Sequence, residues 1–422
     1  MFLSFILLIF NADNQYIMSV FKDHKVGVNE LLQVIPESLL AKLSSTTKVD
    51  HYAKVLHGQK LFYLLMYGVI ENDRLSQRSL EDTFNDPFFK QLFHLNEDER
   101  VRRSSISERL SKIDPDYFKQ IYDCIYDQFS RHYSSKDQEK YNLIRVDSTM
   151  VSDVTGKMVT GLDNKSGKKT TKYSVSFDGL LPCSLEVFTE STYLSEENAL
   201  PQAILNHVKK ETDHNNIYIV DRGLQSTRTM RDFDKNKIVF VARMKENRKH
   251  IEKESFIQDT QNLDLGESIL LKDAKVQLFT GVPILNKRGN KHYREELIDN
   301  AFRLVVIKSK SDEKEYWLLT NDFELSPKEI AETYRRRWDI EVFFRFIKQE
   351  LNVSHLISLN KNGMQVMIYV TMIVAMLILV YKKANNIGYK TAKRRFAMEI
   401  RNLTIALIVV QCGGDPKLFF KT

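Results

Sequence analysis

The chain has 422 residues, of which 43% are hydrophobic and 28% are charged, and its 62 basic and 55 acidic side chains give a formal net charge of +7. This composition excludes a disordered or fibrous protein and is typical of a soluble globular protein with two or three domains. The moderate positive charge favours polyanionic partners without identifying nucleic acid. Three cysteines that lie far apart, with no CxxC pair, predict reduced thiols in the cytosol and neither a disulfide framework nor a zinc site.

Residues 1–10 form an apolar run that resembles the core of a signal peptide. No basic segment precedes this run and no small-residue cleavage site follows it, which disfavours a secretory signal. Met18 opens a more ordinary polar beginning. We therefore expect residues 1–17 to be a non-structural N-terminal extension that arises from an upstream start codon.

Residues 18–138 are expected to form a helical DNA-binding domain. Apolar residues recur every three or four positions in several segments between residues 25 and 135, which predicts amphipathic helices. One segment begins with a serine-rich, basic turn that suits phosphate contact. Its cations are Arg102, Arg103, Arg109 and Lys112. A solvated surface helix is the alternative, and no zinc-finger or helix-turn-helix signature decides between the two.

Short β-prone runs replace the helical pattern in residues 139–245, the expected first part of a core domain. A strand at 141–149 leads to Asp147, and a second strand at 216–223 leads to Asp221. The remaining predicted elements are a hairpin of 172–179 and 181–189, a short helix at 226–233 and a strand at 237–245. This order of strands and helices predicts an α/β fold with a mixed sheet.

Residues 246–325 alternate turns with β-prone runs, and we expect them to form a separate β-rich insertion domain. A charged helix at 328–351 follows the insertion. Ser326 supplies its N-cap, and Pro327 occupies its first helical position.

The second part of the core is expected at residues 326–385, where the charged helix precedes an apolar segment at 364–380. This segment approaches the length of a membrane span, but Gln365 and Thr371 interrupt it. A buried core helix is the favoured interpretation, and a membrane anchor is the alternative. Residues 386–422 are expected to form a C-terminal tail helix that offers a dimer contact.

The charged helix carries one acid, three cations and a phenol at spacings of three, four, four and three. These residues are Tyr334, Arg337, Glu341, Arg345 and Lys348. At roughly 100° per residue they fall within an arc of about 80° on one face. Such a face suits an anion that needs a metal, and a phosphodiester is the obvious candidate. The alternative is a solvated ladder of ion pairs, each worth a few tenths of a kcal/mol.

Asp147 and Asp221 follow buried strands, and α/β proteins commonly place ligands at the carboxyl ends of their strands. If the charged helix packs across that edge, Glu341 joins the two aspartates. Three oxygen donors of this kind suit Mg²⁺ or Mn²⁺. Two such ions can activate the attacking group and stabilise the leaving oxygen in phosphodiester chemistry. An isolated aspartate at a strand end is more commonly a turn or capping residue, so Glu341 on its cationic face carries the functional interpretation.

The spacing Y-(2)-R-(3)-E-(6)-K, met by Tyr334, Arg337, Glu341 and Lys348, resembles the signature of bacterial insertion-sequence transposases of the DDE class, in the insertion sequence 4 family. The segments VDST and IVDRG are similar to the family's two aspartate regions. The resemblance covers roughly residues 100–385 and is weakest outside them.

This resemblance implies a ribonuclease-H-like core in which Asp147, Asp221 and Glu341 are the catalytic, metal-binding triad, with Mg²⁺ as cofactor and Mn²⁺ as substitute. Tyr334, Arg337 and Lys348 would hold the phosphates of the transposon end. Arg345 and Arg243 would assist them. Some relatives cut the second strand through a hairpin and stack a flipped base on an aromatic residue of the insertion, for which Trp317 is the candidate. A buried strand tryptophan is the alternative for that residue.

The implied partners are the terminal inverted repeats and target DNA, with a homodimer in the synaptic complex and no membrane. A cytoplasmic, nucleoid-associated enzyme would cleave the element ends and join the 3′-hydroxyl to the target. A metal-dependent nuclease without strand transfer and a catalytically inactive DNA-binding derivative are the alternatives. Four lysines in the loop after Asp147 fit either a DNA backbone contact or a solvated loop; they are Lys165, Lys168, Lys169 and Lys172.

Overall fold

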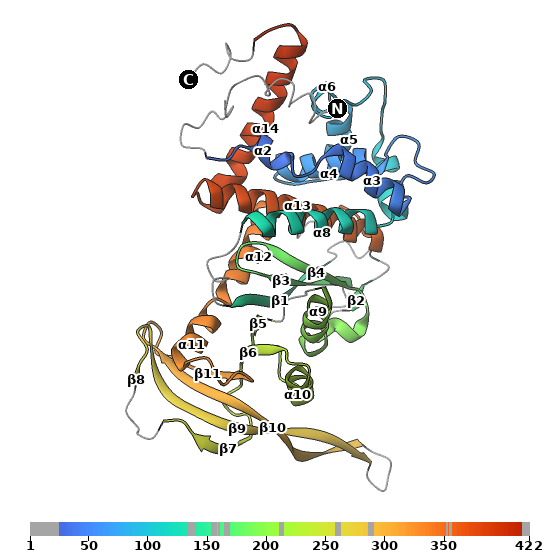
Figure 1. Ribbon diagram of the computed structural model, residues 1–422. Coiled ribbons are helices and arrows are strands. Elements are labelled where there is room, and N and C mark those ends of the chain that lie inside the picture. Colours follow the sequence, from blue (N-terminus) through green and yellow to red (C-terminus); the bar gives the residue numbers. More distant parts are fainter. Residues whose placement is uncertain are drawn as a thin grey trace. The chain divides into compact units, whose positions relative to one another are not determined.

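The computed structural model describes residues 25–133, 141–152, 158, 161–163, 169–210, 215–257, 263–285, 291–351, 353 and 357–415. These residues form two compact units (Figure 1). The helical unit comprises the described residues within 1–134, 151–171 and 344–422, and the sheet unit comprises those within 135–150 and 172–343. The expected extension at residues 1–17 lies outside the described part of the chain. The expected domain boundaries stay predictions.

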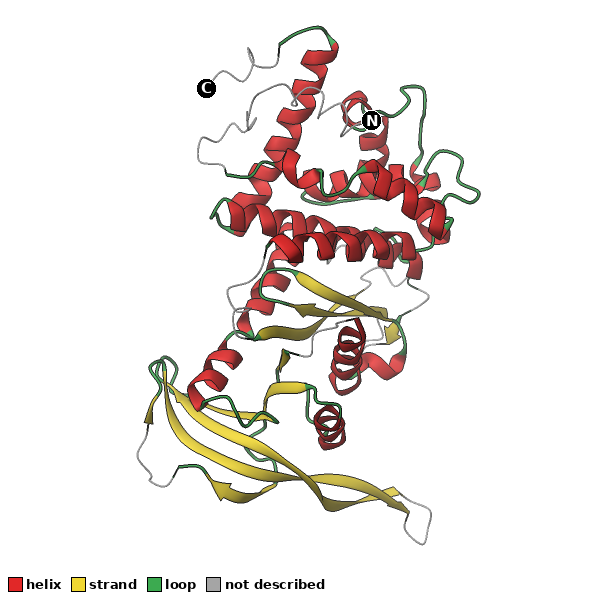
Figure 2. Ribbon diagram, viewed as in Figure 1, coloured by secondary structure: helices red, strands yellow, loops and turns green. Residues whose placement is uncertain are grey.

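Helices, red in Figure 2, dominate the helical unit. They are α2 (Val28–Leu32), α3 (Glu37–Thr47), α4 (Gly58–Glu71), α5 (Gln77–Asn85), α6 (Pro87–Leu92), α7 (Arg103–Lys112), α8 (Asp116–His132), the last residues of α12 (Trp338–Glu350), α13 (Lys361–Ala384) and α14 (Tyr389–Gln411). One short strand, β2 (Leu162–Asp163), pairs with the first residues of β3 (Lys169–Phe177). In α8 the buried residues recur every three or four positions from Tyr117 to Phe129, which is the pattern that predicted a helix.

Helix α13 packs against α4, α7, α8 and α14 within the helical unit. Every residue from Ile368 to Tyr381 is buried. Among the described residues this is the one helix long and apolar enough to cross a membrane, and 89% of its most apolar 18-residue window is buried inside the protein. The predicted core helix is therefore confirmed, because a helix surrounded by other helices must be apolar on all sides.

The sheet unit contains a mixed sheet with helices between its strands. Its elements are β1 (Asn142–Ser152), the main part of β3, β4 (Pro182–Phe188), η2 (Ser191–Leu194), α9 (Glu196–Lys210), β5 (Asn216–Val220), α10 (Thr227–Lys235), β6 (Val239–Arg243), β7 (His250–Ser255), β8 (Leu263–Asp264), β9 (Ser268–Leu285), β10 (Lys291–Ser309), β11 (Glu315–Thr320), α11 (Pro327–Arg335) and the first residues of α12.

The central strands follow the order β4-β3-β1-β5-β6. Strands β1, β5 and β6 run parallel, and β3 and β4 form an antiparallel hairpin, as predicted. Helix α9 follows β4 and helix α10 follows β5. A first strand, then a hairpin, then two strands parallel to the first, arranged across the sheet in the order just given, form the ribonuclease-H-like arrangement. The predicted fold class is thus confirmed.

The β-rich segment continues this sheet. Strand β11 pairs antiparallel with β6, and the long strands β9 and β10 extend the sheet outward to β7. Thus the segment is joined to the core through the backbone hydrogen bonds between β6 and β11.

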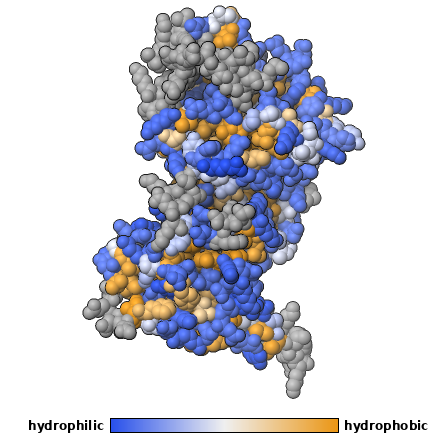
Figure 3. Space-filling view, viewed as in Figure 1, coloured by the Kyte–Doolittle hydropathy of each residue, from blue (hydrophilic) through white to orange (hydrophobic). Residues whose placement is uncertain are grey.

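The surface of the protein that faces the viewer in Figure 3 is mainly hydrophilic, with apolar side chains in smaller groups.

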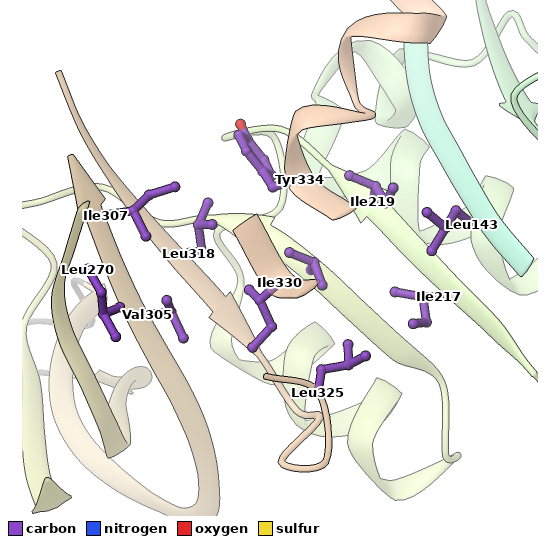
Figure 4. Close-up of a cluster of buried hydrophobic side chains, with 11 residues drawn as sticks. Leu143, Ile217, Ile219, Leu270, Val305, Ile307, Leu318, Leu325, Ile330 and Tyr334 are labelled. Atoms are coloured by element: carbon purple, nitrogen blue, oxygen red, sulfur yellow. The ribbon is translucent and has the colours of Figure 1, made fainter. Parts of the chain in front are cut away.

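A buried apolar cluster fixes α11 against this sheet (Figure 4). Ile330 and Tyr334 of α11 pack with Ile217 and Ile219 of β5 and with Leu318 of β11. Ser326 and Glu329 form a capping box at the start of α11, with Pro327 at the first helical position, so the predicted N-terminus is confirmed.

The predicted single charged helix at 328–351 is wrong in one respect. Helix α11 ends at Arg335, and α12 begins at Trp338. The amide of Arg337 still donates to the carbonyl of Tyr334 at 3.0 Å, so the chain tightens into a short turn between the helices. Periodicity cannot detect this break because the junction, Arg336-Arg337, contains neither glycine nor proline.

Candidate active site

The two aspartates come from neighbouring parallel strands. In the register of β1 and β5, Arg145 lies opposite Ile219. Extending this register by two residues places Asp147 level with Asp221. The sequence predicted Asp147 at the end of its strand. This prediction is wrong, because β1 continues to Ser152 and Asp147 lies within it.

Arg337 joins Asp221 to Glu341. Its Nη1 atom lies 2.7 Å from Oε1 of Glu341 and 3.9 Å from Oδ2 of Asp221. The hydroxyl of Tyr334 donates to Oδ1 of Asp221 at 3.0 Å. Arg337 is enclosed, with a side chain only 15% exposed, whereas the two carboxylates remain open to solvent at 45% and 32%. Two residues of the predicted signature, Tyr334 and Arg337, therefore contact Asp221 in the sheet unit, and a third, Glu341, is held through Arg337.

The charges of this site perturb one another. Burial raises the pKa of Asp147 to about 6, and the negative charges of Glu196 and Asp221 also raise it. The hydrogen bond from the Ser148 amide and the positive charge of Arg337 lower the same pKa. Burial also raises the pKa of Tyr334, and the charge of Asp221 raises it further. Burial lowers the pKa of Arg337, but Asp221 and the hydrogen bond to Glu341 outweigh this effect and leave it raised.

Asp147, Asp221 and Glu341 fit a divalent cation by their chemistry. All three offer hard carboxylate oxygens, which Mg²⁺ and Mn²⁺ prefer. Burial raises the pKa of Asp147, and a cation bound beside it would favour its charged form. In the described part of the chain, no three Asp, Glu, His or Cys side chains converge closely enough to hold an ion as they stand. Positive charge between Asp221 and Glu341 is supplied by Arg337.

The other predicted contact residues lie in varied settings. Arg243 ends β6, and its guanidinium lies 4.4 Å from the centre of the Tyr316 ring. Trp317 is half-buried on β11, where its Nε1 donates to Glu315 at 3.3 Å. Arg345 and Lys348 are exposed on the part of α12 that belongs to the helical unit.

The basic residues predicted before the core have mixed roles. Arg109 donates to the carbonyls of Leu56 at 2.9 Å and Val49 at 2.6 Å, so its guanidinium is engaged within the helical unit. This contradicts a phosphate-binding role for Arg109. Arg102 and Arg103 are exposed, and Lys112 forms an ion pair with Glu108 at 2.6 Å.

The lysines of the predicted loop are also divided. Lys172 is fully buried and donates to the carbonyl of Leu194 at 2.6 Å, which excludes it from a solvated loop. Lys169 pairs with Asp163 at 2.8 Å. Lys165 and Lys168 lie outside the described residues.

Sequence reasoning missed two features beside the aspartates. Glu196, at the start of α9, acts electrostatically on both Asp147 and Lys172. A cavity of about 270 Å³ adjoins the helix junction and is lined by residues that include Tyr316, Tyr334, Arg337 and Trp338. The signature spacing links Tyr334 to Arg337, but no spacing rule links them to Tyr316 or Glu196, which come from other elements of the sheet unit.

The sequence profile described as the transposase DDE domain matches residues 138–377, more than half of the chain. The chain belongs to this family. The transposase is 26% identical over 338 residues to a putative transposase for insertion sequence element IS4SA from Synechocystis sp., covering 80% of this chain and 85% of that one. It is 25% identical over 265 residues to a probable transposase for element IS5377 from Geobacillus stearothermophilus, covering 63% of each chain.

One solved structure, a piggyBac transposase synaptic complex with hairpin DNA, aligns with 94% of this chain and 82% of its own at 11% identity and a TM-score of 0.43. The family match and the curated relatives together show that the protein is a DDE transposase of an insertion sequence. The predicted identification of the class is therefore confirmed.

Proposed function

We propose that this transposase binds the terminal inverted repeats of its element, cleaves the element ends and joins the freed 3′-hydroxyl to target DNA. The observation that carries this proposal is the cluster in which Tyr334 and Arg337 contact Asp221 and Arg337 also pairs with Glu341, beside the strand that bears Asp147. An enclosed arginine and a phenol beside the carboxylates suit a site that must align a DNA phosphate as well as bind a metal.

The three carboxylates Asp147, Asp221 and Glu341 would hold Mg²⁺, for which Mn²⁺ can substitute. When bound, such ions activate the attacking oxygen and stabilise the leaving oxygen of an in-line displacement. Arg337 offers a planar pair of donors suited to one phosphate, and its hold on Asp221 and Glu341 keeps it close to the scissile position. Tyr334 orients Asp221 through its hydroxyl.

The remaining proposed DNA contacts are cations on the elements that carry or adjoin the three carboxylates. Lys348 and Arg345 are exposed cations on the helix that carries Glu341, and Arg243 ends the strand next to β5. We propose that all three contact the phosphates of the transposon end. Trp317 stays the candidate for stacking a flipped base, and its half-buried ring leaves one part accessible.

We further propose a homodimer in the synaptic complex, a cytoplasmic, nucleoid-associated location and membership of the insertion sequence 4 family. The signature spacing of Tyr334, Arg337, Glu341 and Lys348 supports the family, and the tail helix α14 offers the dimer contact.

A cleavage assay tests the chemical step. Asp147→Asn and Glu341→Gln should abolish Mg²⁺-dependent nicking of a duplex that carries the element end, with Glu254→Gln on the exposed strand β7 as a matched control. Nicking by either variant at the wild-type rate would refute the assignment. A joining assay with pre-cleaved ends separates the transposase from a nuclease without strand transfer, because the nuclease would only hydrolyse.

A further inference from the structure

A fully buried arginine lies two residues before Asp147. Arg145 has no exposed surface, although it stands on the strand that carries a catalytic candidate. Its guanidinium donates in three directions: Nη1 to the carbonyl of Leu143 at 2.6 Å, Nε to the carbonyl of Arg336 at 3.1 Å and Nη2 to Oδ2 of Asp339 at 3.0 Å. Arg336 belongs to the junction between α11 and α12, and Asp339 lies in the first turn of α12.

The turn of the β3–β4 hairpin is shaped around this guanidinium. Gly179 has a φ of +98°, and a Cβ atom placed there would lie 2.9 Å from Nη1 of Arg145. Any larger residue would therefore meet the arginine directly and adopt a strained backbone. Burying an arginine is costly unless its donors are hydrogen-bonded, and here one carboxylate and two carbonyls accept from Nη2, Nη1 and Nε.

The contacts of Arg145 cross the active site. They tie β1, which carries Asp147, to the junction that carries Arg337 and to the helix that begins just before Glu341. The Phe177 and Phe343 rings stack with centroids 4.9 Å apart and hold the same part of α12 to β3. This apolar stack restricts rotation of α12 about its own axis less than the directional hydrogen bonds of Arg145 do. Arg145 links the helix break to the strand by polar contacts, one of them directed at the backbone of the break.

We infer that Arg145 is a positioning residue, which sets the separation between Asp147 and Glu341 by holding the α11–α12 junction against β1. It touches neither DNA nor metal. This inference rests on the proposed function, because the separation matters only if the two carboxylates act on one cation site. The carbonyl of Arg336 accepts from the amide of Asp339 at 3.1 Å and from Nε of Arg145 at 3.1 Å, so Arg145 binds the short turn that separates α11 from α12.

Mn²⁺ binding to the DNA-free protein, followed by electron paramagnetic resonance, tests the inference without relying on cleavage. Lysine is shorter and cannot donate in three fixed directions, so Arg145→Lys should weaken Mn²⁺ binding by about 10- to 100-fold, the range typical for partners that orient metal ligands. Cleavage at saturating Mg²⁺ should fall by about 100-fold, as expected when reacting groups shift by about 1 Å. Binding of duplex DNA should stay within about twofold.

Arg303→Lys is the matched control. Among the described residues of the sheet unit, Arg303 is a second buried arginine with this pattern, bonded at 2.8 Å to each oxygen of Asp273 and at 2.6 Å to the carbonyl of Leu325. It lies on β10, which β6 and β11 separate from β5 in the strand order of the sheet. Its substitution should lower the melting temperature while leaving Mn²⁺ binding unchanged.

Asp339→Asn serves as a second variant if Arg145→Lys does not fold, and it should weaken Mn²⁺ binding in the same direction by a smaller factor. Equal Mn²⁺ affinity in the Arg145, Asp339 and Arg303 variants would overturn the positioning role and leave the proposed function intact. No Mn²⁺ binding by the wild-type protein, or the same binding in Asp147→Asn, would overturn the proposed function itself.

Discussion

Replacing Arg337 with glutamine should strengthen metal binding while it weakens catalysis. In the DNA-free protein Arg337 is the cation between Asp221 and Glu341, at 3.9 and 2.7 Å. An incoming divalent ion must therefore compete with this guanidinium for the same two carboxylates. Both carboxylates are partly exposed, so solvent screening limits each pair to roughly 0.5–1 kcal/mol. The two pairs together correspond to about 1–2 kcal/mol, or a change of about 5- to 30-fold in Kd.

The assay is Mn²⁺ titration of wild-type protein and Arg337→Gln without DNA. We expect the variant to bind Mn²⁺ about 5- to 30-fold more tightly and to cleave an element end more slowly, because it has lost its phosphate donor. Arg335→Gln is the matched control: it removes the same charge from the exposed end of α11, two residues away. If Arg337→Gln binds Mn²⁺ no more tightly than Arg335→Gln, the competition between arginine and metal is refuted.

Three further predictions follow from the same contacts. Tyr334→Phe removes the hydroxyl that orients Asp221 and should slow cleavage by roughly three- to tenfold, about 1 kcal/mol in barrier height, without altering the melting temperature by more than a few degrees; an unchanged rate would contradict the role of this bond. Because folding raises the pKa of Asp147 to about 6 from roughly 4 in the unfolded chain, the metal-free protein should gain stability from this group as the pH falls from 7.5 to 5, and that gain should be absent from melting curves of Asp147→Asn. Gly179→Ala forces a side chain against Arg145 at a φ of +98° and should cost about 1–3 kcal/mol in denaturant unfolding, whereas Gly266→Ala, with a similar φ of +94° but open space around it, should cost less.

The sequence by itself determined most local structure. Short β-prone runs predicted the strands β1, β5 and β6, whose residues are largely buried, and apolar residues at every third or fourth position predicted α8, because a helix buried on one face requires that periodicity. Ser326-Pro327 predicted the start of α11 through capping chemistry that involves only neighbouring residues. The apolar composition of α13 also predicted that this helix is buried. The fixed spacing of Tyr334, Arg337, Glu341 and Lys348 predicted the candidate site, because all four residues lie in one short segment and can be recognised without tertiary structure.

Tertiary structure alone decided how these groups meet. A single helix would have aligned Tyr334, Arg337 and Glu341 on one face, but the junction at Arg336 turns the chain, and Asp221 from a distant strand receives both the phenol and the guanidinium. Lys172 belonged to a basic loop in the sequence and is buried in the fold. Arg145 gave no signal at all, since its partners lie up to 194 residues away. Local periodicity reports which face of an element is buried, whereas hydrogen bonds between distant segments depend on the packing of the whole sheet unit.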